Sequence, residues 1–188
     1  MEQIAMNSTV GRLVSILLAI VTAGVLLIVP GAAFAQQKLK FSYTQPPGLT
    51  KYTQQHALDV GDVPGHQIRI ASLHTKFASD SPEYDGVKVV ETFGWIQSDY
   101  TNATGRFAQY TVSHMANGDM VFSRTEGLGQ TSSAADGSGK TSYSTVTTLT
   151  GGTGKFASIR GTIRGGGVTD FKTGPNNSPS EGEYWFQK

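Results

Sequence analysis

The stretch TLTGGTGKFASIRGTIRGGG, residues 148–167, carries the glycines on which the choice of fold class depends. Glycines at such spacing occur in loops that bind nucleoside triphosphates or dinucleotides, and also in turns of all-β folds. A triphosphate loop requires Ser or Thr after Gly-Lys, because that hydroxyl binds magnesium, but Phe156 follows Lys155. A dinucleotide loop requires a following helix, and the few residues between Ala157 and Gly161 cannot form one.

We therefore interpret this stretch as a structural element of an all-β fold. Its glycines supply the backbone conformations of a turn or bulge, and we expect Phe156 to plug the end of a barrel with Ile159 beside it. The glycines at 165–167 let the next strand bend as a sheet closes. The residues assigned to this structural motif are Gly151, Gly152, Gly154, Phe156 and Gly161.

The rest of the chain after residue 35 has the composition of an all-β domain, rich in Gly, Thr, Ser and aromatic residues. Asn117-Gly118 stands between two strand patterns and predicts a hairpin. Short strands without a helical segment predict an eight-stranded antiparallel β-barrel, or a sandwich. The predicted strands are 38–43, 66–77, 87–98, 106–115, 119–127, 141–150, 161–171 and 181–187.

The first 35 residues read as an export signal. An uncharged run follows Arg12 and ends at Pro30, and Ala33 and Ala35 stand where a signal peptidase reads small residues. The alternative is an uncleaved membrane anchor, because the apolar run approaches the ~20 residues that span a bilayer. The sequence thus predicts a signal peptide over 1–35 and one domain over 36–188, periplasmic or extracellular after cleavage near Ala35 and in contact with the membrane only during export.

Charge and composition exclude several partners and chemistries. A net charge of +1 argues against nucleic acid, which requires a concentrated basic face. The chain has no cysteine, so disulfides, thiol catalysis and thiolate zinc sites are excluded. The four histidines show no recognised ligand spacing, so we expect no metal and no cofactor.

The segment TSYSTVTTLTGGTGKFASIRG, residues 141–161, resembles the allene oxide cyclase barrel, a fold shared with plant dirigent proteins. Weaker similarity extends to residues 58–65 and 105–127. The resemblance implies a calycin-like barrel of eight antiparallel strands, often trimeric, with a mostly apolar central cavity that holds a small hydrophobic molecule. It also implies that Gln67 stands where the family has a water-holding asparagine. The family's acidic motif near the first strand has no counterpart in LKFSYTQPPG, residues 39–48.

Strand alternation suggests which polar groups could line such a cavity. It places Glu91 on the same face as Val89 and Phe93, so that burial would raise the pKa of the carboxyl and suit it to general acid work. The alternative is that Glu91 faces solvent or pairs with Arg124. The candidate catalytic residues are Glu91, Gln67 and Arg124, and the candidate ligand-binding residues are Phe93, Trp95, Tyr110 and Tyr143.

Three functions compete on this basis. The first is an exported barrel that binds a small lipophilic or aromatic molecule, as a trimer or dimer, with or without isomerase activity by confinement. The second is a structural or interaction protein whose barrel is filled by Phe93, Trp95, Tyr143 and Trp185. The third is carbohydrate binding on exposed Trp or Tyr rings. The volume inside the barrel separates these functions, and the glycines at 165–167 favour a cavity.

Overall fold

The computed structural model describes residues 36–170 and 172–188, and the predicted signal peptide lies outside them. Within the described part of the chain, no helix is long and apolar enough to cross a membrane. A short 3₁₀ helix, η2 (Gly154–Phe156), joins two of the strands. The strands are β1 (Leu39–Gln45), β2 (Thr50–Asp59), β3 (His66–Lys76), β4 (Glu83–Tyr84), β5 (Val87–Thr101), β6 (Thr104–Met115), β7 (Met120–Ser133), β8 (Gly139–Gly152), β9 (Ile159–Asp170), β10 (Gly174–Pro175) and β11 (Ser178–Phe186).

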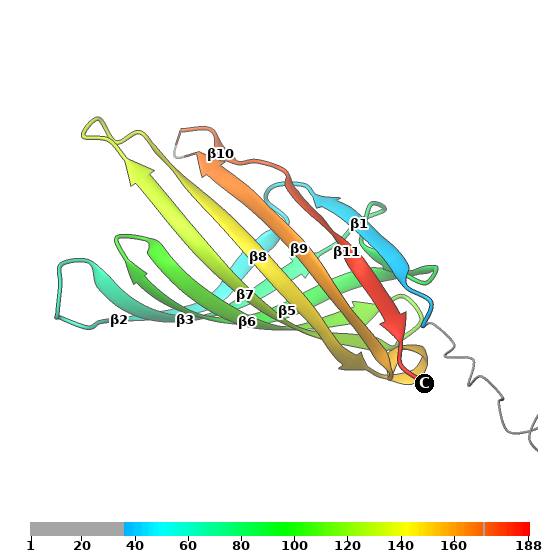
Figure 1. The fold of residues 1–188 in the computed structure, drawn as a ribbon. Coiled ribbons are helices and arrows are strands. Elements are labelled where there is room, and N and C mark those ends of the chain that lie inside the picture. Colours follow the sequence, from blue (N-terminus) through cyan, green and yellow to red (C-terminus); the bar gives the residue numbers. More distant parts are fainter. Residues whose placement is uncertain (1–35, 171) are drawn as a thin grey trace, which may run out of the picture. The chain divides into compact units, whose positions relative to one another are not determined.

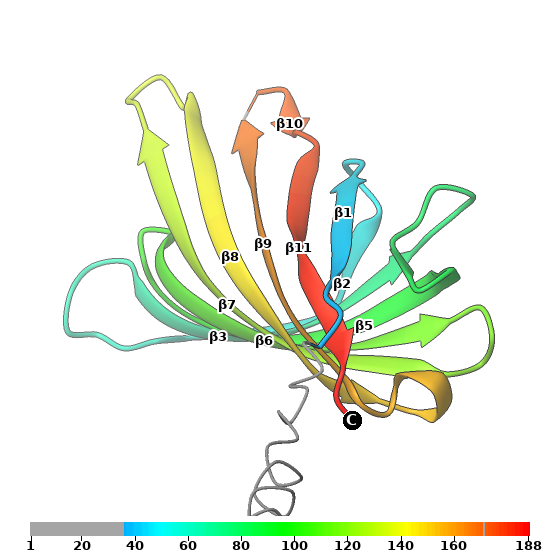
Figure 2. The same cartoon turned by 45° about the vertical axis from the view of Figure 1, so that its right-hand side comes forward.

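The strands form a strongly curved antiparallel sheet in the order β1-β11-β9-β8-β7-β6-β5-β3-β2, with β10 beside β9 and β4 beside β5 (Figures 1 and 2). The all-β antiparallel prediction is confirmed, and each predicted run contains a strand. The predicted hairpin at Asn117-Gly118 joins β6 to β7. The edge strands β1 and β2 do not pair with each other in the described chain, so backbone hydrogen bonds do not close the sheet into a barrel.

Strand β2 was not expected from the sequence. It pairs with β3 along its length, but all ten of its residues are exposed. A strand with no buried face needs no alternation of apolar and polar side chains, so its sequence TKYTQQHALD carries no strand signal. β2 thus lengthens the sheet at one edge without contributing to the core.

Aromatic side chains join β1 to the segment after β3, on the inner, concave face of the sheet. The Phe41 and Tyr84 rings stack with their centroids 5.1 Å apart, and the Tyr43 ring meets the edge of Phe77 at 6.0 Å. The backbone N–H of Asp85 donates to the Tyr184 hydroxyl over 2.8 Å. Side-chain packing therefore holds the curved sheet together where its edges lack backbone pairing.

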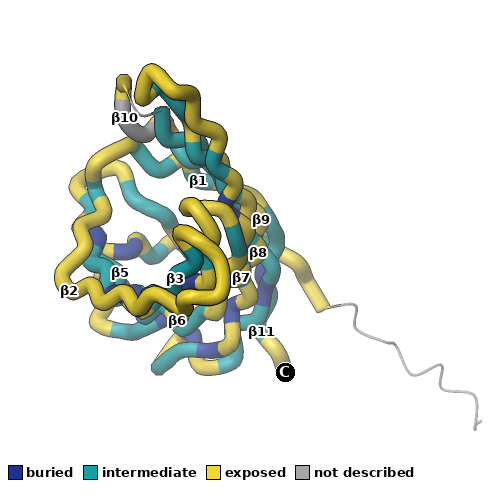
Figure 3. Tube along the Cα trace, turned by 90° about the vertical axis from the view of Figure 1, so that its left-hand side faces the viewer, coloured by how far each residue is buried: buried dark blue, intermediate teal, exposed yellow. Residues whose placement is uncertain are grey.

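The core lies at the end of the sheet where β5, β7 and β9 begin and β6, β8 and β11 end (Figure 3). Phe156 and Ile159, which the sequence predicts at the end of a barrel, are fully buried at this end of the open sheet. Gly154 begins η2 with a φ of +48°, a left-handed conformation that favours glycine. The core residues are Phe41, Tyr84, Val89, Met115, Val121, Leu149, Phe156, Ile159, Ile163 and Tyr184.

A β-bulge in β5 changes which side chains face inward. The pairing of β5 with β6 shifts between Val89 and Glu91, and Val90 is 48% exposed. Val89 pairs with buried Met115, whereas Glu91 pairs with His114 on the opposite, outer face. The prediction that Val89 and Glu91 share one face is therefore wrong, because one extra residue reverses the alternation.

Candidate functional site: the inner cleft

The inner face of the sheet holds a cleft of about 310 Å³. It lies against the core, since Phe41, Tyr84, Val89 and Ile163 belong to both. The rest of the lining consists mainly of hydroxyl-bearing and small residues. These are Tyr43, Thr50, Thr75, Thr92, Gly94, Thr111, Ser113, Ser123, Thr125, Tyr143, Thr145, Thr147, Gly165, Gly166, Ser178 and Ser180, with Gln45, Leu73, Phe77, Pro82, Gln109 and Pro179 completing it.

Hydroxyl groups pair across the cleft wall, between the neighbouring strands β7 and β8 and, over β9, between β8 and β11. The Oγ1 atoms of Thr125 and Thr147 lie 2.7 Å apart, and the Tyr143 hydroxyl lies 2.6 Å from Ser178 Oγ. A hydroxyl has one proton and two lone pairs, so in each pair the accepting group keeps its own proton for a further bond. The wall can therefore offer both donors and acceptors to a molecule in the cleft.

The cleft contains no charged side chain among its lining residues in the described chain. Burial raises the pKa of the Tyr43 hydroxyl, and the nearby Asp80 carboxylate raises it further, so this phenol stays neutral and can donate. An ion entering the cleft would lose water without gaining a partner of opposite charge. The chemistry of the lining therefore suits uncharged groups.

Glycines on the inner face of β9 make room for tyrosine. A Cβ at Gly167 would lie 2.6 Å from the Tyr143 hydroxyl oxygen and 2.7 Å from Ser178 Oγ. Any side chain there would displace the hydrogen-bonded pair. This agrees with the expectation that the glycines at 165–167 leave space inside the sheet, although Tyr143 occupies part of it.

Glu91 does not face the cleft. Its carboxylate lies 2.8 Å from Nε2 of His74 and 3.5 Å from Nδ1 of His114 on the outer face. The hydrogen bond with His74 is the main reason that the pKa of Glu91 is lowered, whereas a buried general acid would have a raised one. The raised pKa expected for a buried Glu91 is therefore not found, because the bulge places the carboxyl on the outer face, where it pairs with two histidines and not with Arg124.

The other two candidate catalytic residues also lie outside the cleft lining. The Gln67 amide donates to Asp59 Oδ1 over 2.8 Å, near the end of the β2–β3 hairpin. Arg124 lies on the outer face, with Nη2 3.0 Å from Glu126 Oε1. The structure does not bring Glu91, Gln67 and Arg124 together into one site.

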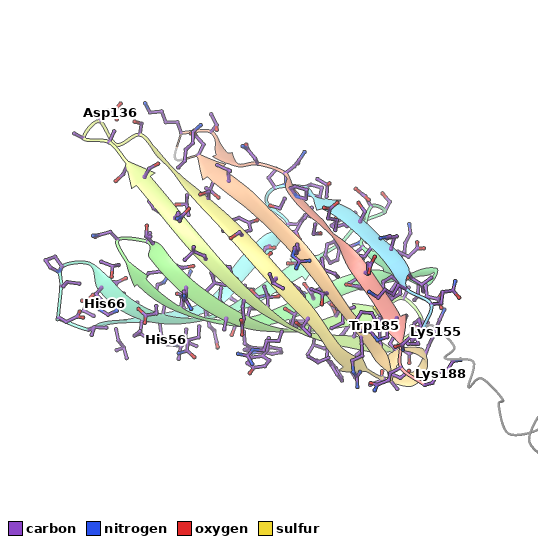
Figure 4. All side chains as sticks on the ribbon, viewed as in Figure 1. His56, His66, Asp136, Lys155, Trp185 and Lys188 are labelled. Atoms are coloured by element: carbon purple, nitrogen blue, oxygen red, sulfur yellow. The ribbon has the colours of Figure 1, made fainter. Side chains whose placement is uncertain are left out.

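Of the four candidate ligand-binding residues, only Tyr143 lines the cleft. Phe93 and Trp95 follow the bulge in β5, and Tyr110 on β6 pairs with Trp95. All three side chains lie on the outer face. Trp185 also points outward, with the Lys38 ammonium 5.8 Å from its ring (Figure 4). The interior is therefore not filled by Phe93, Trp95 and Trp185.

Sequence reasoning missed the threonines and serines of the cleft wall. Strand β8 has Tyr143, Thr145 and Thr147 at alternate positions, each half-buried, between exposed neighbours. The sequence TSYSTVTTLT does not reveal this alternation, because residues with hydroxyl groups stand at both the inner and the outer positions. Knowing which face is inward requires the bulges and the curvature of the sheet.

Two of the four histidines, which show no ligand spacing in the sequence, come together in the folded sheet. His74 and His114 meet the same carboxylate, that of Glu91, from two strands on either side of β5. Among residues 36–170 and 172–188, however, no group of three or more ligating side chains is placed to hold a metal ion.

Comparisons with known proteins identify no relative. The chain matches no protein-family model and no curated protein, and its structure matches no solved structure. The resemblance to the allene oxide cyclase barrel thus remains a prediction from the sequence motif.

Proposed function

We propose that this protein binds an uncharged small molecule in the inner cleft, with its apolar or aromatic part toward Phe41 and Tyr84 and its hydroxyl or carbonyl groups toward Thr125 and Thr147. The observation that carries the proposal is the lining of a 310 Å³ cleft by aromatic and hydroxyl side chains without a charged one in the described chain. Cleft volumes near 300 Å³ lie at the lower end of the range for ligand sites.

The residues that line the cleft favour an uncharged ring compound over other classes of small molecule. A fatty acid has a carboxylate that would enter the cleft without a cation to pair with, and burial of an unpaired charge is costly. A fully polar ligand would leave the apolar end of the cleft, at Val89 and Ile163, without a partner. A small ring compound with a few hydroxyl or carbonyl groups meets both demands.

The allene oxide cyclase resemblance, export and assembly as a trimer or dimer belong to the same proposal. In that fold the curved sheet would complete a closed, eight-stranded barrel around the ligand. If a reaction occurs, an isomerisation would depend on confinement and on hydroxyl hydrogen bonds, since the cleft wall supplies no carboxylate or histidine within the described residues.

Binding to purified residues 36–188 tests the proposal. Native mass spectrometry and calorimetry would compare resorcinol, vanillyl alcohol and a flavanone with benzoate and palmitate. We expect saturable binding of at least one uncharged ring compound and none of the two anions. Preference for palmitate, or a lack of binding by every uncharged probe, would refute the proposal.

A double variant, Thr125→Val with Thr147→Val, locates the site. Replacing both partners of a hydrogen bond by apolar groups of the same shape leaves stability nearly unchanged. Loss of a hydrogen bond to the ligand weakens binding about 3- to 10-fold. The matched control is Thr148→Val, because Thr148 lies next in β8 but is exposed on the outer face. Equal affinities of the double variant and the control would place the ligand elsewhere.

A further inference from the structure

The outer face of the sheet carries a second hollow, whose lining shares only Thr145 and Gly165 with the inner cleft. It is an open groove of about 780 Å³ that crosses five strands, from Gln97 and Asp99 on β5 to Arg164 on β9. At ~4.8 Å between neighbouring strands, its length is about 19 Å. We name this hollow the outer groove.

Two exposed aromatic rings extend the outer groove at one side. Trp95 on β5 and Tyr110 on β6 are direct cross-strand partners, and they are 49% and 60% exposed. They stand two residues from Gln97 and Ala108 of the groove, which is about 7 Å along each strand. Large aromatic rings exposed side by side are a feature of many binding surfaces, so this platform is a candidate for one.

Arg124 connects the aromatic platform to the groove. Its guanidinium lies 5.9 Å from the centre of the Tyr110 ring, and it pairs at 3.0 Å with Glu126, which lines the groove. These contacts place the Arg124 guanidinium between the Tyr110 ring and Glu126. The platform and the groove thus form one continuous surface.

The groove combines an apolar floor with balanced charges. Ala108, Leu128 and Val146 provide the apolar part, with Leu128 and Val146 41% and 43% exposed. Two carboxylates and two guanidinium groups stand among them, so neither sign dominates. These charged lining residues are Asp99, Glu126, Arg106 and Arg164.

We propose that the outer groove with Trp95 and Tyr110 binds a neutral oligosaccharide. The C–H faces of sugar rings are apolar and pack on aromatic rings, while their hydroxyls bond to planar carboxylate, amide and guanidinium groups. A polyanion, nucleic acid included, would require a predominantly basic surface, and the groove has equal numbers of acidic and basic residues. A neutral chain of sugars fits both the floor and the charge balance.

The chain has only two tryptophans, which allows binding to be read at one position. In a Trp185→Phe variant, Trp95 is the sole tryptophan and reports on the platform. Soluble β-glucan, α-mannan, galactan and arabinoxylan would be titrated against this variant and, in affinity gels, against the wild type. We expect one of these polymers to shift the Trp95 emission to the blue and to retard the protein.

Single-residue variants test whether the polymer binds at the outer groove or elsewhere on the surface. Trp95→Ala or Tyr110→Ala should weaken binding about tenfold or more, because stacking on an aromatic anchor supplies more than ~1.4 kcal/mol. Trp185→Ala should bind like the wild type, since Trp185 on β11 lies five strands from Trp95 in the sheet order and does not line the groove.

Two results would overturn the proposal. One is an unchanged Trp95 emission with all four polymers. The other is a concentration-dependent dimer in sedimentation that Trp95→Ala and Tyr110→Ala abolish, which would assign the surface to a second copy of the chain. Neither result bears on the inner cleft, because that cleft lies on the other face of the sheet.

Discussion

At the scale of single residues, Glu91 shows how two histidines keep a half-buried carboxylate ionised. His74 stacks on Phe93 with ring centroids 4.5 Å apart, and His114 lies 5.4 Å from the same ring. Phe93 thus holds both imidazoles beside the carboxylate. The cluster joins β3, β5 and β6 on the outer face and contributes to stability there.

We predict that Glu91→Gln lowers the melting temperature at pH 7 and leaves ligand binding in the inner cleft unchanged. The folded pKa of Glu91 is lowered from its ordinary value of 4.5, so its contribution is present above that value and is lost as pH falls through the lowered pKa. The difference in melting temperature between wild type and variant should therefore vanish in acid. A loss of cleft binding in the folded variant would contradict the outward orientation of Glu91.

Phe156 is the residue on which the core end of the sheet depends most. We predict that Phe156→Ala reduces the free energy of unfolding by about 3–5 kcal/mol, because it leaves a cavity where a fully buried ring stood. Urea titration followed by circular dichroism measures the loss. Phe122→Ala, at a partly exposed position of β7, serves as the control and should cost clearly less. Equal losses would show that Phe156 does not anchor the core.

At the scale of elements, His66, at the end of the β2–β3 hairpin in Figure 4, connects this hairpin to β5. Its Nδ1 lies 2.6 Å from Asp62 in the hairpin loop and its Nε2 lies 2.8 Å from Asp99. A ring that donates from both nitrogens is protonated, and the bond to Asp62, followed by that to Asp99, raises the pKa of His66. Arg106 stands opposite Asp99 on β6 and shares that carboxylate's surroundings.

We predict that this hairpin loosens as pH rises. A histidine whose pKa is raised in the folded state stabilises the protein fully at a pH below its unfolded pKa of 6.5. This contribution is lost as the pH rises through the folded pKa. Hydrogen exchange at the amides of Val60 and Asn102, which bond to His66 and Gly65, reports the change. His66→Gln, measured at each pH, corrects for the intrinsic pH dependence of exchange. Equal protection of these amides in the wild type and in His66→Gln across the pH range would disprove that His66 holds the hairpin to β5.

The elements also show how far the sequence predicts this fold. Strands such as β6 and β8 were found because they carry β-branched and aromatic residues over the length of a strand. β2 was missed because it has no buried face, and the bulge in β5 was hidden because Val89 and Val90 are both apolar. That one missed residue moved Glu91, Phe93 and Trp95 to the wrong face, so these candidate residues were misplaced although β5 itself was predicted.

At the scale of the whole described domain, a single curved sheet offers two chemically different surfaces. The inner face has uncharged hydroxyls above an aromatic core, and the outer face has charged and aromatic side chains around an open groove. Alternation along each strand separates the two sets without a second layer of structure. Two independent binding roles are thus compatible with one small domain.

Residues 36–188 form one compact unit, which predicts that they fold on their own. Expressed without the first 35 residues, the protein should remain soluble without detergent and unfold in one cooperative transition, because its core and all its sheet pairings lie within this unit. Sedimentation and thermal unfolding followed by circular dichroism measure both properties. The full chain, purified in parallel, is the control. N-terminal sequencing of the exported product should give Gln36 as its first residue. If residues 36–188 required detergent, the prediction that they fold on their own would be wrong. If the exported protein kept its first 35 residues, the signal-peptide prediction would be wrong and the membrane-anchor alternative would stand.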